Sequence, residues 1–184
     1  MFPISIAGPR ITLREFRPDD LDASMAVVGD SAVTQTLSFD VRTQEDQAER
    51  LRQDIARART DPRPDYYLAI ANSADTLVGF VRIGFGRDRS GELGYALRRE
   101  DWGKGYATEA TRLLITFGFD TLCLHRLQAA CGPDNRASQR LLARLGFTPE
   151  GRLRDHVFTN GAWRDSLLYS LLEHEWRENL SDAL

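Results

Sequence analysis

The sequence predicts an α/β domain built on a mixed, mostly antiparallel sheet with flanking helices. In the middle of the chain, strand-like segments follow one another across short turns, which is typical of an antiparallel meander. Beyond residue 108, strand and helix patterns alternate, which is typical of strand–helix units. Neither a repeat nor a long Pro/Gly linker divides the chain, so we expect residues 1–184 to form a single domain.

The first part of the chain predicts one strand and two helices. Residues 10–16, RITLREF, alternate apolar and polar side chains as a half-buried strand does. Pro18 and the acidic residues after it are typical of a helix start. Thr43 can cap the second helix, in which apolar residues such as Leu51 recur at helical spacing. This helix must end before the prolines of residues 61–65.

Three strands form the predicted meander. They are residues 66–71, 76–85 and 92–98, joined by the polar turns NSAD and GRDRSG. Because turns of this length leave no room for a crossover, consecutive strands should run antiparallel.

The sequence period then changes from that of a strand to that of a helix. From Thr108, apolar residues fall on one helical face, and a strand follows at residues 126–131. A second helix is expected over residues 135–146, with Gly146 at its end.

The last predicted unit is a hairpin. Residues 151–158 and 163–172 are strand-like, and Asn160–Gly161 between them is a strong hairpin signal. The last strand, SLLYSLL, could pair across a sheet edge with a second copy, so the sequence leaves a homodimer open.

Charge and hydropathy argue against two kinds of partner. Lys plus Arg number 24 against 27 Asp plus Glu, and the net charge is −3, so no basic field would attract nucleic acid or an anionic membrane. The N-terminus MFPISIAGPR lacks a signal-peptide pattern, and no apolar run approaches the about 18 residues of a membrane span. We therefore expect a cytoplasmic protein.

The cysteines and histidines do not predict a metal site. Cys123 and Cys131 form no C-x-x-C pair, and the three histidines show no ligand spacing with them. We expect no metal, and a buried free thiol at each cysteine.

A glycine-rich turn opens the helix after the meander, where residues 100–110 read EDWGKGYATEA. A triphosphate-binding loop requires Ser or Thr after Gly-Lys, whereas Gly105 follows Lys104, and a dinucleotide turn requires Gly or Ala where Thr108 stands. Gly103 and Gly105 leave backbone N–H groups open to an anion at a helix start. Each such contact stabilises a bound anion by about 0.3–1 kcal/mol at a surface and up to about 2 kcal/mol when partly buried. The turn predicts a pyrophosphate site, with a merely tight turn as the alternative.

These residues resemble the acyl-CoA loop, [R/Q]-x-x-G-x-[G/A], of the GCN5-related N-acetyltransferases (GNAT). The matching residues are Trp102, Gly103, Lys104, Gly105, Tyr106 and Ala107, with Trp where many members have Arg or Gln. The loop WGKGYATEA is similar to that of the ribosomal-protein N-acetyltransferases of the RimJ/RimL type. The resemblance extends through ITLREFRPDDLDA, NRASQRLLARLGF and FTNGAWRDSLLYSLLEHEW. It is least specific over residues 31–65.

The resemblance implies a GNAT fold in which the strands at 92–98 and 126–131 splay apart to receive acetyl-CoA. It implies that backbone groups around Leu97 and Arg98 bind the pantetheine amides, and that backbone N–H groups of residues 103–107 bind the pyrophosphate. Lys104 would add charge there, or would simply be solvated. Asn135 would hydrogen-bond near the pantetheine arm, cap the following helix, or do both.

Acetyl transfer requires a neutral amine nucleophile. An α-amino group, with a pKa of about 7.7–8.0, needs about 1 kcal/mol to be neutralised near pH 7, whereas a lysine at about 10.4 needs roughly 4–5 kcal/mol. A lysine acceptor would therefore need a well-placed general base, while an α-amine needs little more than a water relay.

Glu92 is the candidate general base, because alternate residues of its strand should face the acceptor side. Its alternative is a solvent-exposed strand end. Asp155 and Asp165 are further candidates, although Asp165 fits better as a partner for an arginine. His156 could relay a proton or be an ordinary exposed strand histidine.

Ser138 is the candidate general acid. It lies three residues after Asn135, about one helical turn along. In the RimJ/RimL type, the serine of this N-x-x-S spacing lies near the CoA sulfur, where many other GNAT members use a tyrosine. We expect Tyr106 to serve packing rather than catalysis.

The sequence thus predicts an acetyl-CoA-dependent N-acetyltransferase that acts on a primary amine by direct transfer. The acceptor is either a protein or peptide N-terminus or a small-molecule amine. The rival hypothesis is a non-catalytic acyl-CoA-binding or sensing module that kept the loop but lost the transfer activity.

Overall fold

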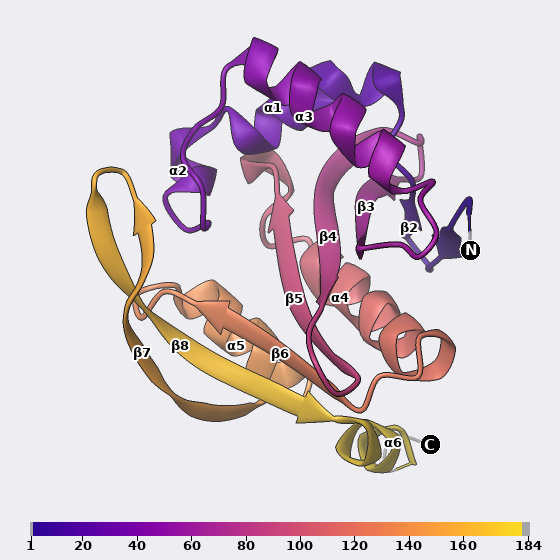
Figure 1. Ribbon diagram of the computed structural model, residues 1–184, viewed down its shortest axis with the longest axis vertical. Helices are drawn as coiled ribbons and strands as arrows, with labels where there is room; N and C mark the ends of the chain where they lie inside the picture. The colour runs from indigo at the N-terminus through magenta and orange to yellow at the C-terminus, as the bar shows by residue number, and fades with distance from the viewer. Residues whose placement is uncertain (1, 182–184) are drawn as a thin grey trace.

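The computed structural model describes residues 2–181, which form one eight-stranded sheet with helices on both faces (Figure 1). The strands are β1 (Ser5–Ala7), β2 (Ile11–Arg14), β3 (Asp65–Asn72), β4 (Leu77–Phe85), β5 (Ser90–Leu97), β6 (Arg126–Cys131), β7 (Thr148–Thr159) and β8 (Ala162–Leu172). The helices are α1 (Leu21–Val28), α2 (Ser31–Thr34), α3 (Gln44–Arg57), α4 (Tyr106–Thr116), α5 (Arg136–Arg144) and α6 (Glu173–Ser181). Short helical turns are η1 (Pro18–Asp20), η2 (Arg99–Asp101) and η3 (Phe117–Thr121).

Across the sheet, the strands lie in the order β1-β2-β3-β4-β5-β6-β8-β7. All neighbours run antiparallel except β5 and β6, which are parallel and are connected through α4. The predicted mixed, mostly antiparallel sheet is confirmed, as is the meander formed by β3, β4 and β5.

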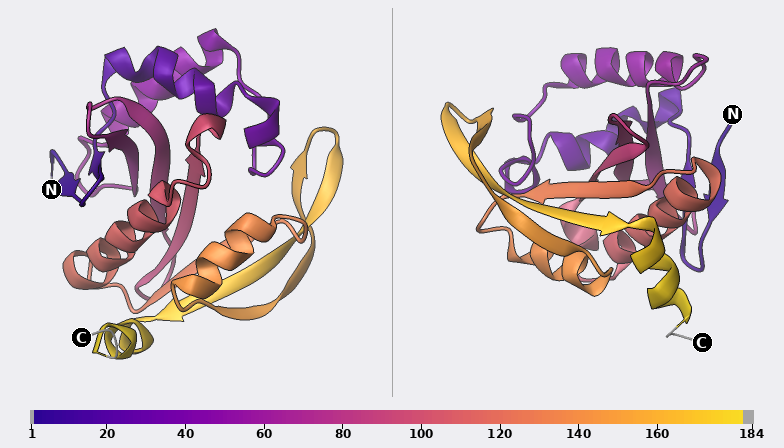
Figure 2. Two further views of the ribbon diagram at one scale, coloured as in Figure 1. Left: turned by 180° about the vertical axis from the view of Figure 1, so that it is seen from behind. Right: turned by 60° about the horizontal axis from the view of Figure 1, so that its bottom comes forward.

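Each face of the sheet has its own hydrophobic core. On one face, α4 and α5 pack against the sheet through residues such as Leu114 and Leu142. On the other face, α1 and α3 cover β3, β4 and β5 through residues such as Val27 and Leu51. Seen from behind, α4 and α5 lie in front of the sheet (Figure 2), whereas α1 and α3 lie at the top of Figure 1. The central strands are therefore covered on both sides.

Capping and turn residues correctly predicted several helix and strand ends. Thr43 caps α3, its side chain accepting a hydrogen bond from the backbone N–H of Asp46 at 3.1 Å. Asn160 and Gly161 have φ angles of 52° and 72°, as a two-residue hairpin turn requires. Gly146 follows α5 with a φ angle of 87°.

The structure adds β1, α2 and α6 to the predicted elements. The first two are short, at three and four residues, and carry little periodic signal. Helix α6 follows β8 with no turn residue between them, so the sequence gives no local signal for the start of the helix. Glu175 marks that start by accepting a hydrogen bond from the backbone N–H of Leu172 at 2.8 Å, and Trp176 anchors the helix with a buried ring.

The last strand does not lie at a sheet edge. The sequence left open that SLLYSLL pairs across an edge with a second copy, but β8 lies inside the sheet and pairs with β6 on one side and β7 on the other. Its backbone groups are therefore used within the chain, and the edges belong to β1 and β7.

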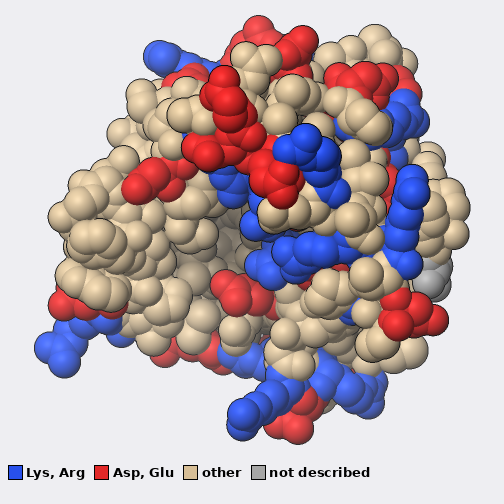
Figure 3. All heavy atoms as spheres, turned by 45° about the horizontal axis from the view of Figure 1, so that its top comes forward, with Lys and Arg blue, Asp and Glu red and all other residues tan. Residues whose placement is uncertain are grey.

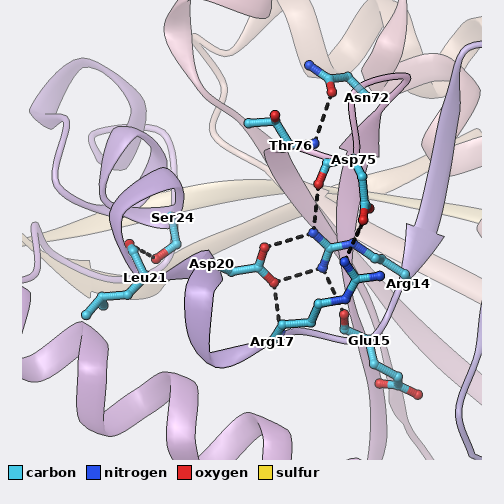
Figure 4. Close-up of polar contacts among 9 residues, drawn as sticks. All are labelled: Arg14, Glu15, Arg17, Asp20, Leu21, Ser24, Asn72, Asp75 and Thr76. Atoms are coloured by element: carbon cyan, nitrogen blue, oxygen red, sulfur yellow. Dashed lines mark hydrogen bonds and ion pairs between the residues drawn. The ribbon is translucent and has the colours of Figure 1, made fainter.

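Arg14 is a buried cation that two carboxylates share (Figure 4). Its two terminal nitrogens donate to the Asp20 carboxylate, each at 2.8 Å, and its Nε donates to Asp75 at 2.8 Å. The side chains of Arg14 and Asp20 are only 7% and 6% exposed. The Asp20 hydrogen bonds raise the pKa of Arg14 above its ordinary value. Asp20 also accepts the backbone N–H of Arg17 at 2.8 Å, so this pair joins β2, η1 and the β3–β4 turn.

We predict that Asp20→Asn lowers the free energy of unfolding by about 3 kcal/mol, because it leaves a buried guanidinium without its main counter-charge. Denaturant unfolding followed by circular dichroism measures this loss. Asp75→Asn is the matched control, since it removes a carboxylate from the same guanidinium at an exposed position and should have a much smaller effect. Equal losses in the two variants would contradict the assignment of Asp20 as the principal partner.

Candidate active site

The strands β5 and β6 pair over only four positions. The parallel pairing runs from the Ser90–Arg126 pair to the Leu93–Ala129 pair. Beyond it, β5 continues along β4 as far as Leu97 while β6 follows β8, so the two central strands part. The splay implied by the family resemblance is thus confirmed. It leaves one edge of β5 without a strand partner over its last residues.

Backbone alternation decides which groups of β5 face this opening. The backbone N–H of Arg98 donates to the carbonyl of Val78 at 2.9 Å and so points toward β4. Leu97, one residue earlier, must direct its N–H and C=O the other way. Its carbonyl accepts the indole N–H of Trp102 at 3.0 Å. Of the two residues predicted to bind pantetheine amides, Leu97 therefore presents its backbone N–H to the opening.

The glycine-rich loop runs from the end of η2 into α4. Gly103 and Gly105 have φ angles of 76° and 83°, in the left-handed region that favours glycine. Within residues 2–181, the backbone N–H groups of residues 103–108 have no hydrogen-bond acceptor. A Cβ at Gly103 would meet nothing within 4 Å, so the space beside it is open. Six successive N–H groups at a helix N-terminus form a ready anion site.

Lys104 in this loop is paired with a buried carboxylate. Its Nζ lies 2.7 Å from the Asp101 carboxylate, which also accepts the Nε of Arg98. Burial alone would raise the pKa of Asp101, but hydrogen bonds from Lys104 and Arg98 outweigh it and lower that pKa. Lys104 is thus an ion-paired side chain rather than a purely solvated one, and Asp101 already offsets part of its charge.

Asn135 and Ser138 lie together at the start of α5. The side-chain oxygen of Asn135 accepts the backbone N–H of Ser138 at 3.1 Å, so Asn135 is the N-cap of this helix, one of its two predicted roles. The side-chain amide N–H groups of Asn135 have no acceptor in the described part of the chain. They are therefore available to a ligand or to water.

Tyr95 is a residue of this region that the sequence did not single out. Its hydroxyl is buried without a hydrogen-bond partner among the described residues. Burial raises its pKa to about 12, and the nearby Ser138 hydroxyl acts in the opposite direction. Cys131 and Tyr169 are its other polar neighbours. A tyrosine on the buried face of a strand needs a partner for its hydroxyl, which is the signal that could have identified it.

Glu92 lies on the opposite face of β5 from Tyr95, because the two positions differ by an odd number. Glu92 lines a cavity of about 120 Å³ together with the β6 residue Gln128 and the β7 residue His156. The Nδ1 of His156 lies 3.0 Å from the Ser166 hydroxyl, which orients its ring. Two of the candidate proton-handling residues therefore share one cavity, although both side chains are exposed.

Asp165, another candidate base, is used structurally. It pairs with Arg152 at 2.5 Å and accepts the backbone N–H of Asp155 at 2.9 Å. That backbone hydrogen bond, with help from Arg152, holds the pKa of Asp165 below its ordinary value. The predicted arginine partnership is confirmed, and neither aspartate lines the cavity with Glu92.

The tip of the β7–β8 hairpin is held to the segment after α2. The guanidinium of Arg164 donates to the carbonyls of Gln35 and Leu37, and the backbone N–H of Asn160 donates to Asp40 at 2.8 Å. In Figure 1 the hairpin tip curls toward α2. The space-filling view shows a hollow in this part of the surface, bordered by side chains of both charges (Figure 3).

The described residues offer neither a metal site nor a membrane-spanning helix. No set of three or more His, Cys, Asp or Glu side chains within residues 2–181 is arranged to hold a metal ion. Among the described helices, none has the length and apolar character needed to cross a membrane.

Cys131 is buried as expected, but Cys123 is exposed, so the expectation of two buried thiols is wrong for Cys123. It lies in the turn before β6 with a φ angle of 52°, where the chain is at the surface.

Comparisons with known proteins agree with this geometry. Residues 10–148 match the acetyltransferase (GNAT) domain family. The uncharacterized N-acetyltransferase p20 of Bacillus licheniformis is 33% identical over 91% of this chain and 95% of its own length. The [ribosomal protein uS5]-alanine N-acetyltransferase of Escherichia coli is 33% identical over 63% of this chain and 56% of its own. The crystal structure of the ribosomal-protein-S5-alanine acetyltransferase from Vibrio fischeri superposes with a TM-score of 0.77 at 26% identity, covering 94% of this chain and 98% of that one.

The two cysteines should differ sharply in reactivity. Burial raises the pKa of the Cys131 thiol to about 11, so at pH 8 roughly one such thiol in a thousand is ionised. We predict that iodoacetamide modifies the native protein at Cys123 alone at pH 8, as intact mass spectrometry would show. Cys131 should react only after unfolding or as the pH approaches 11. Rapid double labelling of the native protein at pH 8 would contradict this, and Cys123→Ser is the control that should abolish native labelling.

Proposed function

The chain belongs to the GNAT acetyltransferase family, of the RimJ/RimL-like type, and on that premise we propose that it transfers an acetyl group from acetyl-CoA directly to a primary amine. Residues 1–184 would act as one N-acetyltransferase domain in the cytoplasm. One observation carries the proposal, namely the row of backbone N–H groups without acceptors at residues 103–108. They lie at the end of the strand that splays from β6.

The residues present fit acetyl-CoA. The N–H groups of residues 103–108 would hold its pyrophosphate, with Gly103 and Gly105 allowing close approach. The backbone N–H of Leu97 and the side-chain amide of Asn135 would bind the pantetheine arm. Because Asp101 holds Lys104, most of the pyrophosphate binding would come from backbone dipoles and less from this side chain.

When bound, acetyl-CoA supplies an activated acetyl group as a thioester. Ser138 would donate a proton to the departing sulfur, as the N-x-x-S resemblance implies. The unpartnered hydroxyl of Tyr95 lies beside Ser138 and supports a site for an additional polar group there. At a pKa of about 12, the tyrosine stays protonated near neutral pH and can act as a hydrogen-bond donor.

The acceptor amine would approach from the opposite face of β5. Glu92 would accept the proton of the acceptor ammonium, and His156 in the same cavity would relay it. The sheet would thus separate the two proton transfers, with the hydroxyl donors on the α4–α5 face and the carboxylate on the other.

We favour the α-amino group of a polypeptide N-terminus as the acceptor. Neutralising an α-amine near pH 7 costs about 1 kcal/mol, whereas neutralising a lysine costs roughly 4–5 kcal/mol, so an α-amine makes the smaller demand on an exposed proton acceptor such as Glu92. The Escherichia coli relative is named for acetylating an alanine of a ribosomal protein. A small-molecule amine is the alternative outcome of the experiment below.

We predict that acetyl-CoA is consumed, with release of free CoA thiol, when the protein meets a panel of N-terminal peptides, and that mass spectrometry places the acetyl group on the α-nitrogen. Peptides with a blocked N-terminus are the matched controls and should not react. Turnover on polyamines or other small amines alone would reassign the acceptor. Tight binding of acetyl-CoA without turnover on any amine would instead support the sensing module.

We predict that Glu92→Gln and Ser138→Ala slow the reaction differently. With an α-amine acceptor, loss of the general base should lower kcat about tenfold near pH 7, and the loss should diminish as the pH rises toward the amine pKa. Loss of the proton donor should lower kcat without that recovery at high pH. Asp165→Asn is the control and should leave the rate unchanged, because Asp165 is bound to Arg152. Unchanged pH–rate profiles at saturating substrates would remove Glu92 and Ser138 from these roles.

A further inference from the structure

Arg10 reaches the glycine-rich loop from the other end of the chain. It lies between β1 and β2, and its guanidinium Nη1 donates to the carbonyl of Lys104 at 2.8 Å. Its Nε lies 2.7 Å from the Glu109 carboxylate, and its charge lies 5.4 Å from the centre of the Tyr106 ring. One side chain therefore contacts the loop, the first residue of α4 and the first turn of that helix.

Glu109 completes a closed set of contacts. Its carboxylate accepts the backbone N–H of Arg10 at 2.8 Å and that of Ile11 at 3.3 Å, besides the guanidinium. Its own backbone N–H donates to the carbonyl of Gly105 at 3.1 Å. The side chain of Glu109 is 11% exposed and that of Arg10 52% exposed. A Cβ at Gly8 would lie 2.8 Å from the Glu109 carboxylate, so a larger residue there would displace that carboxylate from its contacts.

These contacts set the direction of the loop N–H groups. In a trans peptide, the carbonyl of one residue and the N–H of the next point in opposite directions. Because Arg10 holds the carbonyl of Lys104, the N–H of Gly105 must point away from Arg10. Because Glu109 holds the carbonyl of Gly105, the N–H of Tyr106 must point out along the start of α4.

We propose that Arg10 is a positioning residue for the diphosphate of the acyl donor, an inference that rests on the proposed function. Arg10 acts through the carbonyl of Lys104, which it holds so that the Gly105 N–H is directed toward the bound anion. Glu109 supports Arg10 in this role. The left-handed conformation of Gly105 then needs no ligand to select it, and the anion meets donors that are already oriented.

The test is calorimetric binding of two acyl donors, acetyl-CoA and S-acetylpantetheine, which lacks the diphosphate. Arg10→Met keeps the apolar stem and removes the donors. This variant should lower the affinity for acetyl-CoA about tenfold and leave the affinity for S-acetylpantetheine unchanged. Arg10→Lys should also lower the affinity for acetyl-CoA, since a single ammonium cannot hold the Lys104 carbonyl and the Glu109 carboxylate in the same geometry. In the free protein, the Gly105 amide resonance should shift in both variants.

Two further variants separate positioning from charge and from folding. Arg99→Met removes a charge at an exposed position just before the loop and should change neither affinity. Glu109→Gln should also lower the affinity for acetyl-CoA. In the double variant with Arg10→Met, the loss of binding free energy should be smaller than the sum of the two single losses. Glu109→Gln also serves as the second variant if Arg10→Met does not fold.

The outcomes are distinguishable. Failure of the unaltered protein to bind acetyl-CoA would overturn the proposed function and the role of Arg10 with it. Binding of acetyl-CoA by the unaltered protein, with Arg10→Met within twofold of it, would overturn the role of Arg10 alone. Equal losses for both acyl donors would reveal a general structural role, and an equal loss in Arg99→Met would reveal a charge effect. Either result would overturn the positioning proposal.

Discussion

The parting of β5 from β6 after four paired positions is the constraint on which the rest of the site depends. A parallel pair needs a crossover, and here the crossover contains α4, whose N-terminus therefore lies just beyond the end of β5. The positive end of that helix and the open edge of β5 are thus brought together by topology alone. Closing the sheet fully would cover the backbone N–H of Leu97.

By alternation, the same strand would also separate the two proposed proton transfers. Backbone groups of β5 point in turn toward β4 and toward the opening, while its side chains point in turn to the two faces of the sheet. Tyr95 consequently faces α5 and Ser138, and Glu92 faces the cavity shared with His156. A shift of one residue in the register of β5 would exchange these faces, so the β4–β5 pairing is as important to the site as the side chains.

Features set by neighbouring residues could be predicted from the sequence, and features set by distant ones could not. The caps at Thr43 and Asn135 and the turn at Asn160 follow from residues within a few positions. In contrast, the position of β8 inside the sheet depends on how strands distant in the sequence pair, and no local sequence pattern predicts that pairing. The contacts of Arg14 with Asp75, and of Arg10 with Glu109, join residues 61 and 99 positions apart. From the sequence, an arginine in an alternating strand is predicted to be an ordinary exposed side chain, because its carboxylate partner comes from a distant segment.

This difference explains why the sequence identifies the donor more readily than the acceptor. The loop at residues 103–108 is one continuous segment, so its glycines and its helix start can be read together. The proposed acceptor side would combine Glu92 of β5, His156 of β7 and the contacts that hold the hairpin tip to Gln35 and Asp40. Gln35 and Asp40 lie within residues 31–65, the stretch least specific to the family. Under the proposed function, a change of acceptor would therefore require altered contacts between separate segments, whereas the proposed donor loop could stay as it is.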